Sequence, residues 1–410
     1  MQVFTVAEHK FLEEDSKAEI KKLGLELCTN SEQTQFLNLK TDYSVGYFIG
    51  VDWLKTNECA LMVTPKIKHL DYLKMFIDCF NYPEIAPFLK DIYEIKFKEP
   101  SITLETNPFE LTPLIVFHFL NTVKSIVKKG LKKDYIRIED NLNSKIKGKI
   151  IFNKSLKINN FKGRLDRNYC NFQEYSVDCI ENRFLKKALI FVKSYLQRHY
   201  KNEVNLLNTL NYCISAFSEV TEEVEINKIK SFKINPLFKE YAEGLKLAKM
   251  VLQQFSYNIS ETTALSKTKI PPFYINMPLL FELYTYGKLK KQFGKSILFQ
   301  VKGKYGNVDF LDIERKIVID TKYILLYNEE KYEIDNVRQL SGYARDKGIL
   351  KKLELNDTGK IVDCLIIYPS NKGIENEDFD FSKSGLEKET IKQFEQFYKV
   401  GIKLPTKSSS

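Results

Sequence analysis

The chain has 410 residues, of which 43% are hydrophobic and only 17 are glycine, so it is long enough for two or three globular domains and unsuited to a disordered or collagen-like protein. Its formal net charge of +10 permits nucleic-acid binding but does not require it, because a lysine-rich proteome gives the same excess. The seven cysteines are irregularly spaced and form no Cys-x-x-Cys pair, which favours reduced thiols over a disulfide framework or a zinc site.

Two features argue against a secreted or membrane protein. The amino terminus has no basic-then-apolar signal pattern, and the longest apolar run, Leu114–Leu120, is far shorter than a membrane span. We therefore expect a cytoplasmic protein with no membrane partner. His118 lies inside this apolar run, and the four histidines show no ligand spacing, so we expect His118 to be a core residue.

The amino-terminal part of the chain mixes strand and helix patterns. Ser44–Val51 and Cys59–Thr64 are rich in Val, Tyr, Phe, Leu and Met, which predicts strands, and His69–Phe80 and Pro108–Lys129 have helical periodicity. The following segment, Lys145–Arg167, carries eight Lys and Arg residues against one Asp, and we expect a basic hairpin or loop at the surface. Phosphate contact and an ordinary solvated face are both open explanations for its charge.

The middle of the chain is predicted to be helical. Asp178–Tyr200 has the pattern of a long amphipathic helix, and Asn205–Phe217 and Pro236–Phe255 continue the periodicity. Asn258–Thr268 is polar and rich in Ser and Thr, which predicts a loop, and Pro271-Pro272 marks a boundary. We therefore expect three regions: a mixed β/α region over 1–167, a helical region over 168–260 and a further domain over 261–405.

This last domain alternates helices and strands. The predicted order is a helix, three strands, a helix and a buried strand, over Leu279–Gln292, Ser296–Lys302, Val308–Ile313, Lys316–Tyr323, Asp335–Lys347 and Val362–Tyr368. Asp335 is the expected N-cap of the second helix, and the polar tail after Lys403 is expected to fray. The order predicts an α/β domain with a central mixed sheet flanked by helices, in a chain of α+β class overall.

The chain has several triplets of an acidic residue, any residue and lysine, and the one at Asp320 differs from the rest by its context. Asp320 ends an apolar strand, and Asp320 and Lys322 share one face because they are two residues apart. A hairpin centred on Glu314-Arg315 sets Asp309 directly opposite Asp320, with Cβ atoms about 5 Å apart. Glu-Arg is not a favoured tight-turn pair, so a shifted register that puts the two carboxylates on opposite faces is the alternative.

Two carboxylates at that distance repel each other, and a divalent cation resolves the repulsion because oxygen ligands suit Mg²⁺ or Mn²⁺. A metal beside Lys322 suits phosphodiester hydrolysis, since the metal lowers the pKa of a bound water and Lys322 orients that water or neutralises the transition state. The alternative is an ordinary surface hairpin with acidic residues.

Three more side chains are candidates for the same metal and phosphate site. Glu282 lies in an otherwise apolar helical stretch, where it either completes the metal shell or is an exposed helix charge. Gln339 and Tyr343 are four residues apart on a predicted helix and therefore share a face. Both can bond phosphate or water, and a partly buried helix edge is the alternative.

The order of Glu282, Asp309, Asp320-Thr321-Lys322, Gln339 and Tyr343 resembles the PD-(D/E)xK nuclease superfamily. Within it the sequence is similar to the McrC family, on pieces spread over most of the chain: Val45-Gly46-Tyr47, Val63-Thr64-Pro65-Lys66-Ile67, Gly163-Arg164, Glu174-Tyr175-Ser176-Val177-Asp178, Glu181-Asn182-Arg183-Phe184-Leu185-Lys186, Leu280-Phe281-Glu282, Ile319-Asp320-Thr321-Lys322-Tyr323 and Arg338-Gln339-Leu340-Ser341-Gly342-Tyr343. One departure is Val308, which stands where the superfamily name has Pro.

This resemblance implies a Mg²⁺-dependent DNA endonuclease subunit of an McrBC-like restriction complex. Asp309, Asp320 and Glu282 would bind the metal, Lys322 would assist the water, and Gln339 and Tyr343 would contact phosphate or order their helix. The implied partners are an McrB-like AAA+ GTPase ring, which the amino-terminal region would dock on and stimulate, and double-stranded DNA carrying modified cytosine. The chain has no phosphate-binding loop of its own, because Leu289 stands where the first glycine is needed before Gly294-Lys295-Ser296.

Two other functions remain open on the sequence alone. One is a binding and activating subunit of the same kind of complex, with an inert nuclease-like domain. The other is a stand-alone DNA repair nuclease that cuts without any GTPase.

Overall fold

The chain divides into two compact units. The computed structural model describes residues 1–24, 27, 37, 39–79, 82–96, 99–104, 112–201, 204–223, 239–261, 268–304, 306–325, 332–355, 361–374 and 378–406. The first unit combines the two ends of the chain, Met1–Glu110 and Ala264–Ser410, and the second unit is Leu111–Thr263. Both α-helices and mixed sheets are present, which agrees with the expected α+β class.

The first unit contains an amino-terminal sheet of five strands. Their spatial order is β1 (Gln2–Ala7), β3 (Cys59–Thr64), β2 (Phe48–Lys55), β10 (Phe273–Asn276) and β4 (Tyr93–Ile95). Strand β1 is parallel to β3, and the other neighbours are antiparallel. Smaller elements of this part are α1 (Glu14–Lys22), α2 (Tyr72–Cys79), the 3-10 helix η2 (Pro83–Phe88), α3 (Leu89–Ile92) and the paired strands β5 (Ile102–Leu104) and β9 (Thr268–Ile270).

Strand β10 joins segments that are distant in sequence. It pairs with β2 on one side and β4 on the other, although more than 170 residues separate it from β4. From the sequence, these residues were expected in the carboxyl-terminal domain from 261 onward. The structure instead places them in the middle of the amino-terminal sheet, because Phe273 and Ile275 are fully buried there.

The second sheet of this unit is the predicted mixed sheet. Its order is β11 (Ile297–Lys302), β12 (Asn307–Asp312), β13 (Ile317–Thr321), β14 (Asp363–Ile374) and β15 (Phe397–Ile402). The pairs β11–β12 and β12–β13 are antiparallel, whereas β13–β14 and β14–β15 are parallel. Four of the five strands were expected. The fifth, β15, was not. The fraying expected after Lys403 is wrong for residues 404–406, since Leu404 is buried and Thr406 forms a bridge with Leu70, and residues 407–410 lie outside the described residues.

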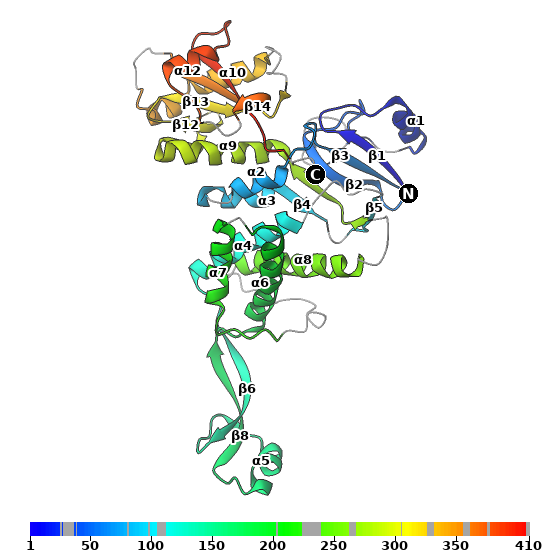
Figure 1. Ribbon diagram of the computed structural model, residues 1–410, viewed down its shortest axis with the longest axis vertical. Coiled ribbons are helices and arrows are strands. Elements are labelled where there is room, and N and C mark those ends of the chain that lie inside the picture. Colours follow the sequence, from blue (N-terminus) through cyan, green and yellow to red (C-terminus); the bar gives the residue numbers. More distant parts are fainter. Residues whose placement is uncertain are drawn as a thin grey trace. The chain divides into compact units, whose positions relative to one another are not determined.

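Helices cover the mixed sheet (Figure 1). They are α9 (Met277–Phe293), α10 (Ile334–Tyr343), α11 (Lys347–Lys352) and α12 (Lys383–Lys388), with a 3-10 turn η6 (Gly294–Ser296) after α9. Tyr286 of α9 stacks on Phe299 and Phe310 of the sheet. Helices α10 and α11 pack against a different set of sheet residues that includes Leu311 and Val318.

The second helix begins and ends differently from the prediction. Its N-cap is Glu333 rather than Asp335, and α10 ends at Tyr343. The expected continuation to Lys347 is interrupted because Asp346 caps a separate helix, α11, by accepting from Gly348 N at 2.6 Å. Gln339 and Tyr343 nevertheless stay on one helix, as predicted.

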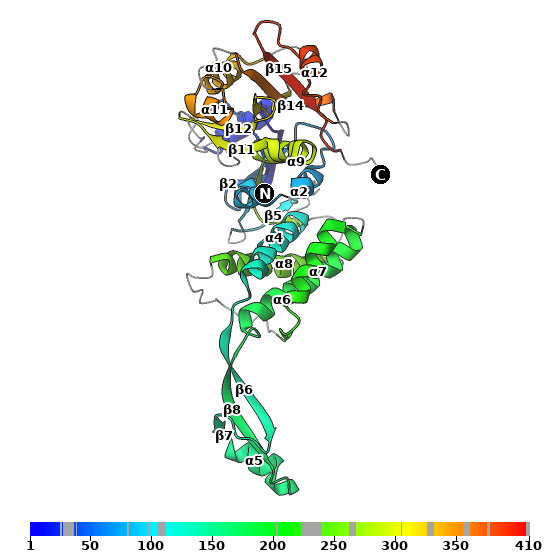
Figure 2. The same cartoon turned by 90° about the vertical axis from the view of Figure 1, so that its left-hand side faces the viewer.

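The second unit is a helical body with a protruding hairpin. The body contains α4 (Thr112–Lys129), α6 (Ile180–His199), α7 (Val204–Ala216) and α8 (Lys239–Glu261). The hairpin pairs β6 (Asp134–Asn143) with β8 (Arg167–Ser176) over ten residues each, and its far end carries β7 (Lys149–Ile150), α5 (Phe152–Ile158) and η3 (Asn160–Lys162). We call this hairpin with its far end the arm; it extends from the helices in both views (Figures 1 and 2).

The arm differs from the expected regions. The expected border between the first and second regions, at 167/168, falls between its two strands. In the structure these strands form one antiparallel pair, and β8 is followed directly by α6. The basic segment 145–167 is a surface hairpin end, as expected, but it also contains a short helix and belongs with the helical body. The predicted loop 258–268 overlaps the end of α8, and its residues 262–267, like 236–238 of the predicted third helix, lie outside the described residues.

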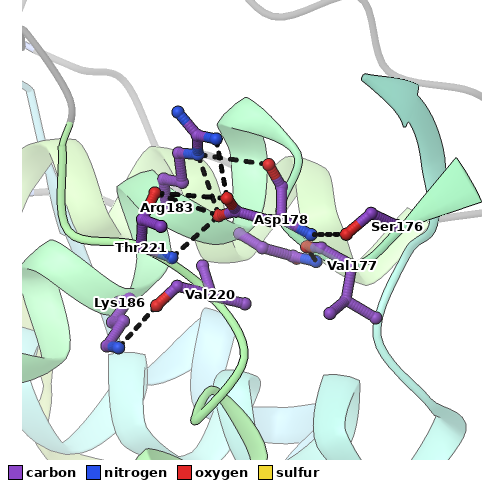
Figure 3. A network of polar contacts seen from close by, with 8 residues as sticks. Ser176, Val177, Asp178, Arg183, Lys186, Val220 and Thr221 are labelled. Atoms are coloured by element: carbon purple, nitrogen blue, oxygen red, sulfur yellow. Dashed lines mark hydrogen bonds and ion pairs between the residues drawn. The ribbon is translucent and has the colours of Figure 1, made fainter. Parts of the chain in front are cut away.

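The arm is fixed to the helical body by a polar network around Asp178 (Figure 3). Arg183 donates to both carboxylate oxygens of Asp178, at 2.9 and 2.7 Å, and Thr221 N donates to the same carboxylate at 2.8 Å. Asn182 donates to the main-chain oxygens of Val177 and Lys132, at 2.7 and 2.9 Å. Since Lys132 precedes β6 and Val177 follows β8, these residues hold both strands of the arm at one point, the arm root.

Two smaller expectations can be compared with the structure. His118 is buried, with 8% of its surface exposed, and its Nε2 lies 3.1 Å from a Glu243 oxygen, so it is a core residue as expected. In the part of the chain that the structure describes, no helix has the length and apolar character needed to cross a bilayer.

Candidate active site

The hairpin between β12 and β13 has the predicted register. Phe310 faces Ile319 and Leu311 faces Val318, which are the pairings that set Asp309 opposite Asp320 one step further along. The turn is not a tight two-residue turn, because four residues, 313–316, connect the strands and Lys316 has a left-handed φ of 60°. The longer turn resolves the conflict between the unfavourable Glu-Arg pair and the register.

Asp309 is held in place by the end of the neighbouring strand. Its Oδ2 accepts hydrogen bonds from the main-chain N and the hydroxyl of Thr321, at 2.8 and 2.6 Å. Burial raises the pKa of Asp309 well above its usual value, and the charges of Asp320 and Glu282 raise it further. The three carboxylates are therefore close enough to oppose one another's ionisation.

Asp320 and Lys322 form an ion pair at the end of β13. Asp320 is only 3% exposed, and its Oδ2 lies 2.8 Å from Lys322 Nζ. Burial raises the pKa of Asp320 despite the opposing effect of Lys322. One partly buried ammonium thus lies beside Asp320, on the face that the acidic-x-Lys spacing predicted.

Glu282 is placed by the first turns of α9. The helix begins directly after β10, where the Asn276 side chain accepts from Leu279 N at 3.2 Å. Glu282 is partly buried and accepts a hydrogen bond from Gln300 of β11, so the alternative of an exposed helix charge is wrong. Burial raises its pKa to about 7, and Asp320 adds to this increase while Gln300 and Lys322 oppose it.

Helix α10 brings two polar side chains to the same place. Lys322 Nζ donates to Gln339 Oε1 at 2.9 Å, and Gln339 Nε2 donates to Tyr343 Oη at 3.2 Å. Gln339 is exposed and Tyr343 is partly buried. All six residues predicted from the sequence thus belong to one connected region, linked through Lys322 and Asp320.

Two residues of this region were not predicted from the sequence. Thr321 lies inside the quoted motif, and its hydroxyl is the group that holds Asp309. Gln300 lies in β11 across from Asp309 in the register of β11 and β12, and it has a left-handed φ of 48° at the step where the pairing of the two strands is irregular. The signal for Gln300 was available only after this register was known.

The chemistry of the donors fits a hard divalent cation better than a soft one. Glu282, Asp309 and Asp320 offer oxygen atoms only, and their mutual repulsion would be relieved by a cation. Within the described residues, however, no three Asp, Glu, His or Cys side chains are arranged closely enough to hold a metal ion by themselves. Any cation would therefore need ligands besides these side chains, such as water or a substrate oxygen.

Comparison with known proteins identifies the family. A family model described as "McrBC 5-methylcytosine restriction system component" matches residues 39–345, which is well over half of the chain. The chain belongs to this family. All six candidate residues lie inside the span that the McrBC model matches.

Two solved structures of the McrBC system resemble the chain weakly. A half-complex from the tetradecameric assembly of Thermococcus gammatolerans McrB AAA+ hexamers with bound McrC has 14% sequence identity and a TM-score of 0.37, covering 97% of this chain and 94% of that chain. The cryo-EM structure of the Thermococcus gammatolerans McrBC complex has 14% identity and a TM-score of 0.31, covering 72% of this chain and 88% of that chain. No curated protein matches the chain.

Proposed function

We propose that this McrBC family member is the nuclease subunit of its restriction system, cutting double-stranded DNA with Mg²⁺ or Mn²⁺. The observation that supports this most strongly is the convergence of Asp309, Asp320 and Glu282 beside the ammonium of Lys322, on residues that the sequence had already set apart. Structural carboxylates are normally paired one to one with cations, whereas a phosphodiesterase site collects several.

Each residue has a distinct role in this proposal. Asp309, Asp320 and Glu282 would hold the cation, which when bound would lower the pKa of a water and stabilise charge on the phosphate. Lys322 is restrained by Asp320 and Gln339, so its ammonium is already oriented for the attacking water or for a phosphate oxygen. Tyr343 orders Gln339 through their hydrogen bond.

The exposed side chains of the arm are evidence for a protein partner. Its far end exposes large apolar side chains in spite of its positive charge, and the most exposed are Phe161 (83%), Leu165 (77%) and Phe152 (71%). Apolar groups gathered on a protruding element are typical of protein interfaces rather than of phosphate contacts. We propose that the arm contacts the other component of the system, an AAA+ GTPase ring, and that the family's modified-cytosine DNA is the substrate.

The site assignment is tested by replacing Asp320 with alanine in the full chain. Cleavage of cytosine-methylated plasmid DNA, measured with Mg²⁺ and the partner GTPase, should be lost, while stimulation of the partner's GTP hydrolysis should persist because Asp320 lies in the first unit and the arm in the second. Asp335→Ala is the matched control, since Asp335 is exposed and pairs with Arg338, three residues along the same helix, at 3.2 Å. Cleavage retained by the Asp320 variant would refute the assignment.

Among the residues that the structure describes, no three Asp, Glu, His or Cys side chains form a metal shell by themselves, which favours one alternative, an activating subunit whose nuclease-like domain is inert. Titration of the full chain with Mn²⁺ separates the two. Saturable binding that disappears in Asp309→Ala supports the nuclease, and binding that is absent from the unmodified chain supports the inert subunit.

A further inference from the structure

A second buried cluster adjoins the candidate active site from the amino-terminal sheet. It consists of Glu8, Tyr47, Lys66 and Tyr323, and we call it the Glu8 cluster. Glu8 follows β1, Lys66 follows β3, and Tyr323 comes directly after Lys322. Three of its four members belong to sequence pieces that resembled the McrC family but had no role assigned to them.

Glu8 is the centre of this cluster. It is fully buried, at 0% exposure, and its Oε1 accepts from Lys66 N at 3.1 Å and from the Tyr323 hydroxyl at 2.8 Å. Its own N donates to Thr64 O at 2.9 Å, which fixes the end of β1 against the end of β3. A residue near the amino terminus is thus bonded to one that lies 315 positions later.

Lys66 makes the contact that reaches the main chain of the active site. Its Nζ donates to Tyr323 O at 2.6 Å and lies 3.6 Å from the centre of the Tyr323 ring. The ring of Tyr47 is 4.7 Å from the same ammonium, on the amino-terminal sheet. Lys66 is therefore held between Tyr47 and Tyr323.

The main chain of Lys322 is restrained from both sides as a result. On one side Lys322 N donates to Ile367 O of β14 at 2.9 Å. On the other side the next carbonyl, Tyr323 O, is held by Lys66. The direction in which the Lys322 side chain leaves the sheet depends on both restraints, because β13 ends at Thr321 and no longer fixes it.

Glu8 and Lys66 are opposite charges in a largely buried place, and each shifts the pKa of the other against the effect of burial. Such a pair needs a reason other than stability. Removing both charges from water costs about as much as their attraction returns, and apolar replacements of similar volume are often neutral. What such a pair provides is a single arrangement, because an ammonium and a carboxylate tolerate few alternative partners inside a protein.

We propose that Glu8 and Lys66 are positioning residues for Lys322: by holding Tyr323, they connect the amino-terminal sheet to the nuclease site and set the direction of the Lys322 ammonium. This inference rests on the proposed nuclease function. It implies that a displacement of the ends of β1 and β3 changes the rate of DNA cleavage.

The test uses the full chain with a double variant, Glu8→Gln with Lys66→Met. Both charges are removed together, so neither partner is left buried and unpaired, and the variant should fold with a melting temperature near that of the unmodified protein. We expect kcat for methylated plasmid cleavage to fall about ten- to a hundredfold with an unchanged KM for DNA, since a small misplacement of a catalytic group has an effect of this size.

Two further variants give a readout that general structural damage would not produce. Tyr323→Phe removes only the hydroxyl bond to Glu8, keeps the carbonyl that Lys66 binds, and should lower kcat less. Lys66→Arg keeps the charge and a donor and should restore part of the rate. Asp52→Asn with Lys96→Met is the matched double control in the same unit, because Lys96 pairs with the buried Asp52 at 2.7 Å, and it should cut at the normal rate.

Hydrogen exchange supplies a measurement independent of cleavage. Peptides covering Lys322–Ile324 should exchange faster in the Glu8→Gln, Lys66→Met variant than in the Asp52→Asn, Lys96→Met control. Unchanged kcat and unchanged exchange in a folded double variant would overturn the inference. If Asp320→Ala also cuts normally, the proposed function itself has failed; if Asp320→Ala is inactive while the double variant cuts normally, only the role of the Glu8 cluster has failed.

Discussion

The pKa values of the carboxylates are shifted in opposite directions at the arm root and at the candidate active site. Burial alone would raise the pKa of Asp178 at the arm root, but the hydrogen bonds and charge of Arg183 together with Thr221 outweigh it, and the pKa is lowered. At the active site burial raises the pKa of Asp309, and its carboxylate neighbours raise it further. The arm root is electrostatically balanced, whereas the site has more negative groups than positive ones.

This difference separates a network whose charges are matched from one in which carboxylates oppose one another's ionisation. The arm root needs nothing from outside, because the Asp178 carboxylate has donors from the same unit. The site is less stable than it would be with fewer carboxylates, and an arrangement of that kind persists when a ligand completes it. Stability measurements on the cation-free protein can therefore tell the two regions apart.

The largest expected effect is on the free energy of unfolding, when an aspartate is replaced by asparagine in each of the two regions. Asp178→Asn should lower the free energy of unfolding of the cation-free protein by about 3 kcal/mol, because Arg183 loses its charged partner in a partly buried place. Asp309→Asn should leave it unchanged or raise it, since an amide oxygen can still accept from Thr321 while the repulsion disappears. Chemical denaturation of both variants without divalent cations measures this, and equal losses would remove the distinction.

A smaller effect is expected from pH. The pKa of Glu282 is raised from 4.5 to about 7, so the folded protein keeps a proton that the unfolded chain releases. Stability of the cation-free protein should therefore fall as pH rises from 4.5 to 7, by about 2 kcal/mol for this group after allowance for solvent screening, and level off above. Thermal melting across this window checks the direction.

Glu282→Gln is the control for that pH dependence. It removes the titrating group, so its stability should change less between pH 4.5 and 7 than that of the unmodified chain. Adding Mn²⁺ at pH 8 should raise the melting temperature of the unmodified chain more than that of the variant. Identical pH slopes for both proteins would show that Glu282 is not the group responsible.

The residues of the candidate site were predictable because their signals are local. Asp320 and Lys322 share a face by strand geometry, and hairpin arithmetic placed Asp309 opposite Asp320. Glu282 and Gln339 were found as polar groups on predicted helices. In each case one element, or two adjacent ones, carried the information.

The parts that were not predicted depend on contacts between distant segments. Strand β10 lies between β2 and β4, and the sequence pattern of its four residues does not indicate which strands it pairs with. The arm was divided because the basic run 145–167 changes composition in the middle of one hairpin, while pairing of β6 with β8 continues across that change. Glu8 showed no sign of its bond to Tyr323, since the two are far apart in sequence.

The smallest expected effect concerns Gln300, which sequence reasoning missed. Its hydrogen bond to Glu282 lowers the pKa of that carboxyl and so opposes burial. Gln300→Met removes the donor at similar volume, and the pKa of Glu282 should rise further, moving the end of the stability decline to higher pH by a fraction of a unit. At pH 7 the variant should need more Mn²⁺ for half-saturation, because a larger share of Glu282 is protonated. Gln292→Met serves as the control, since Gln292 bonds the main chain of Phe379 from the same helix as Glu282. A Gln300 variant with the unmodified pH profile would mean that the Gln300 hydrogen bond does not set the charge of Glu282, and the contrast between the two regions would then rest on burial and carboxylate repulsion alone.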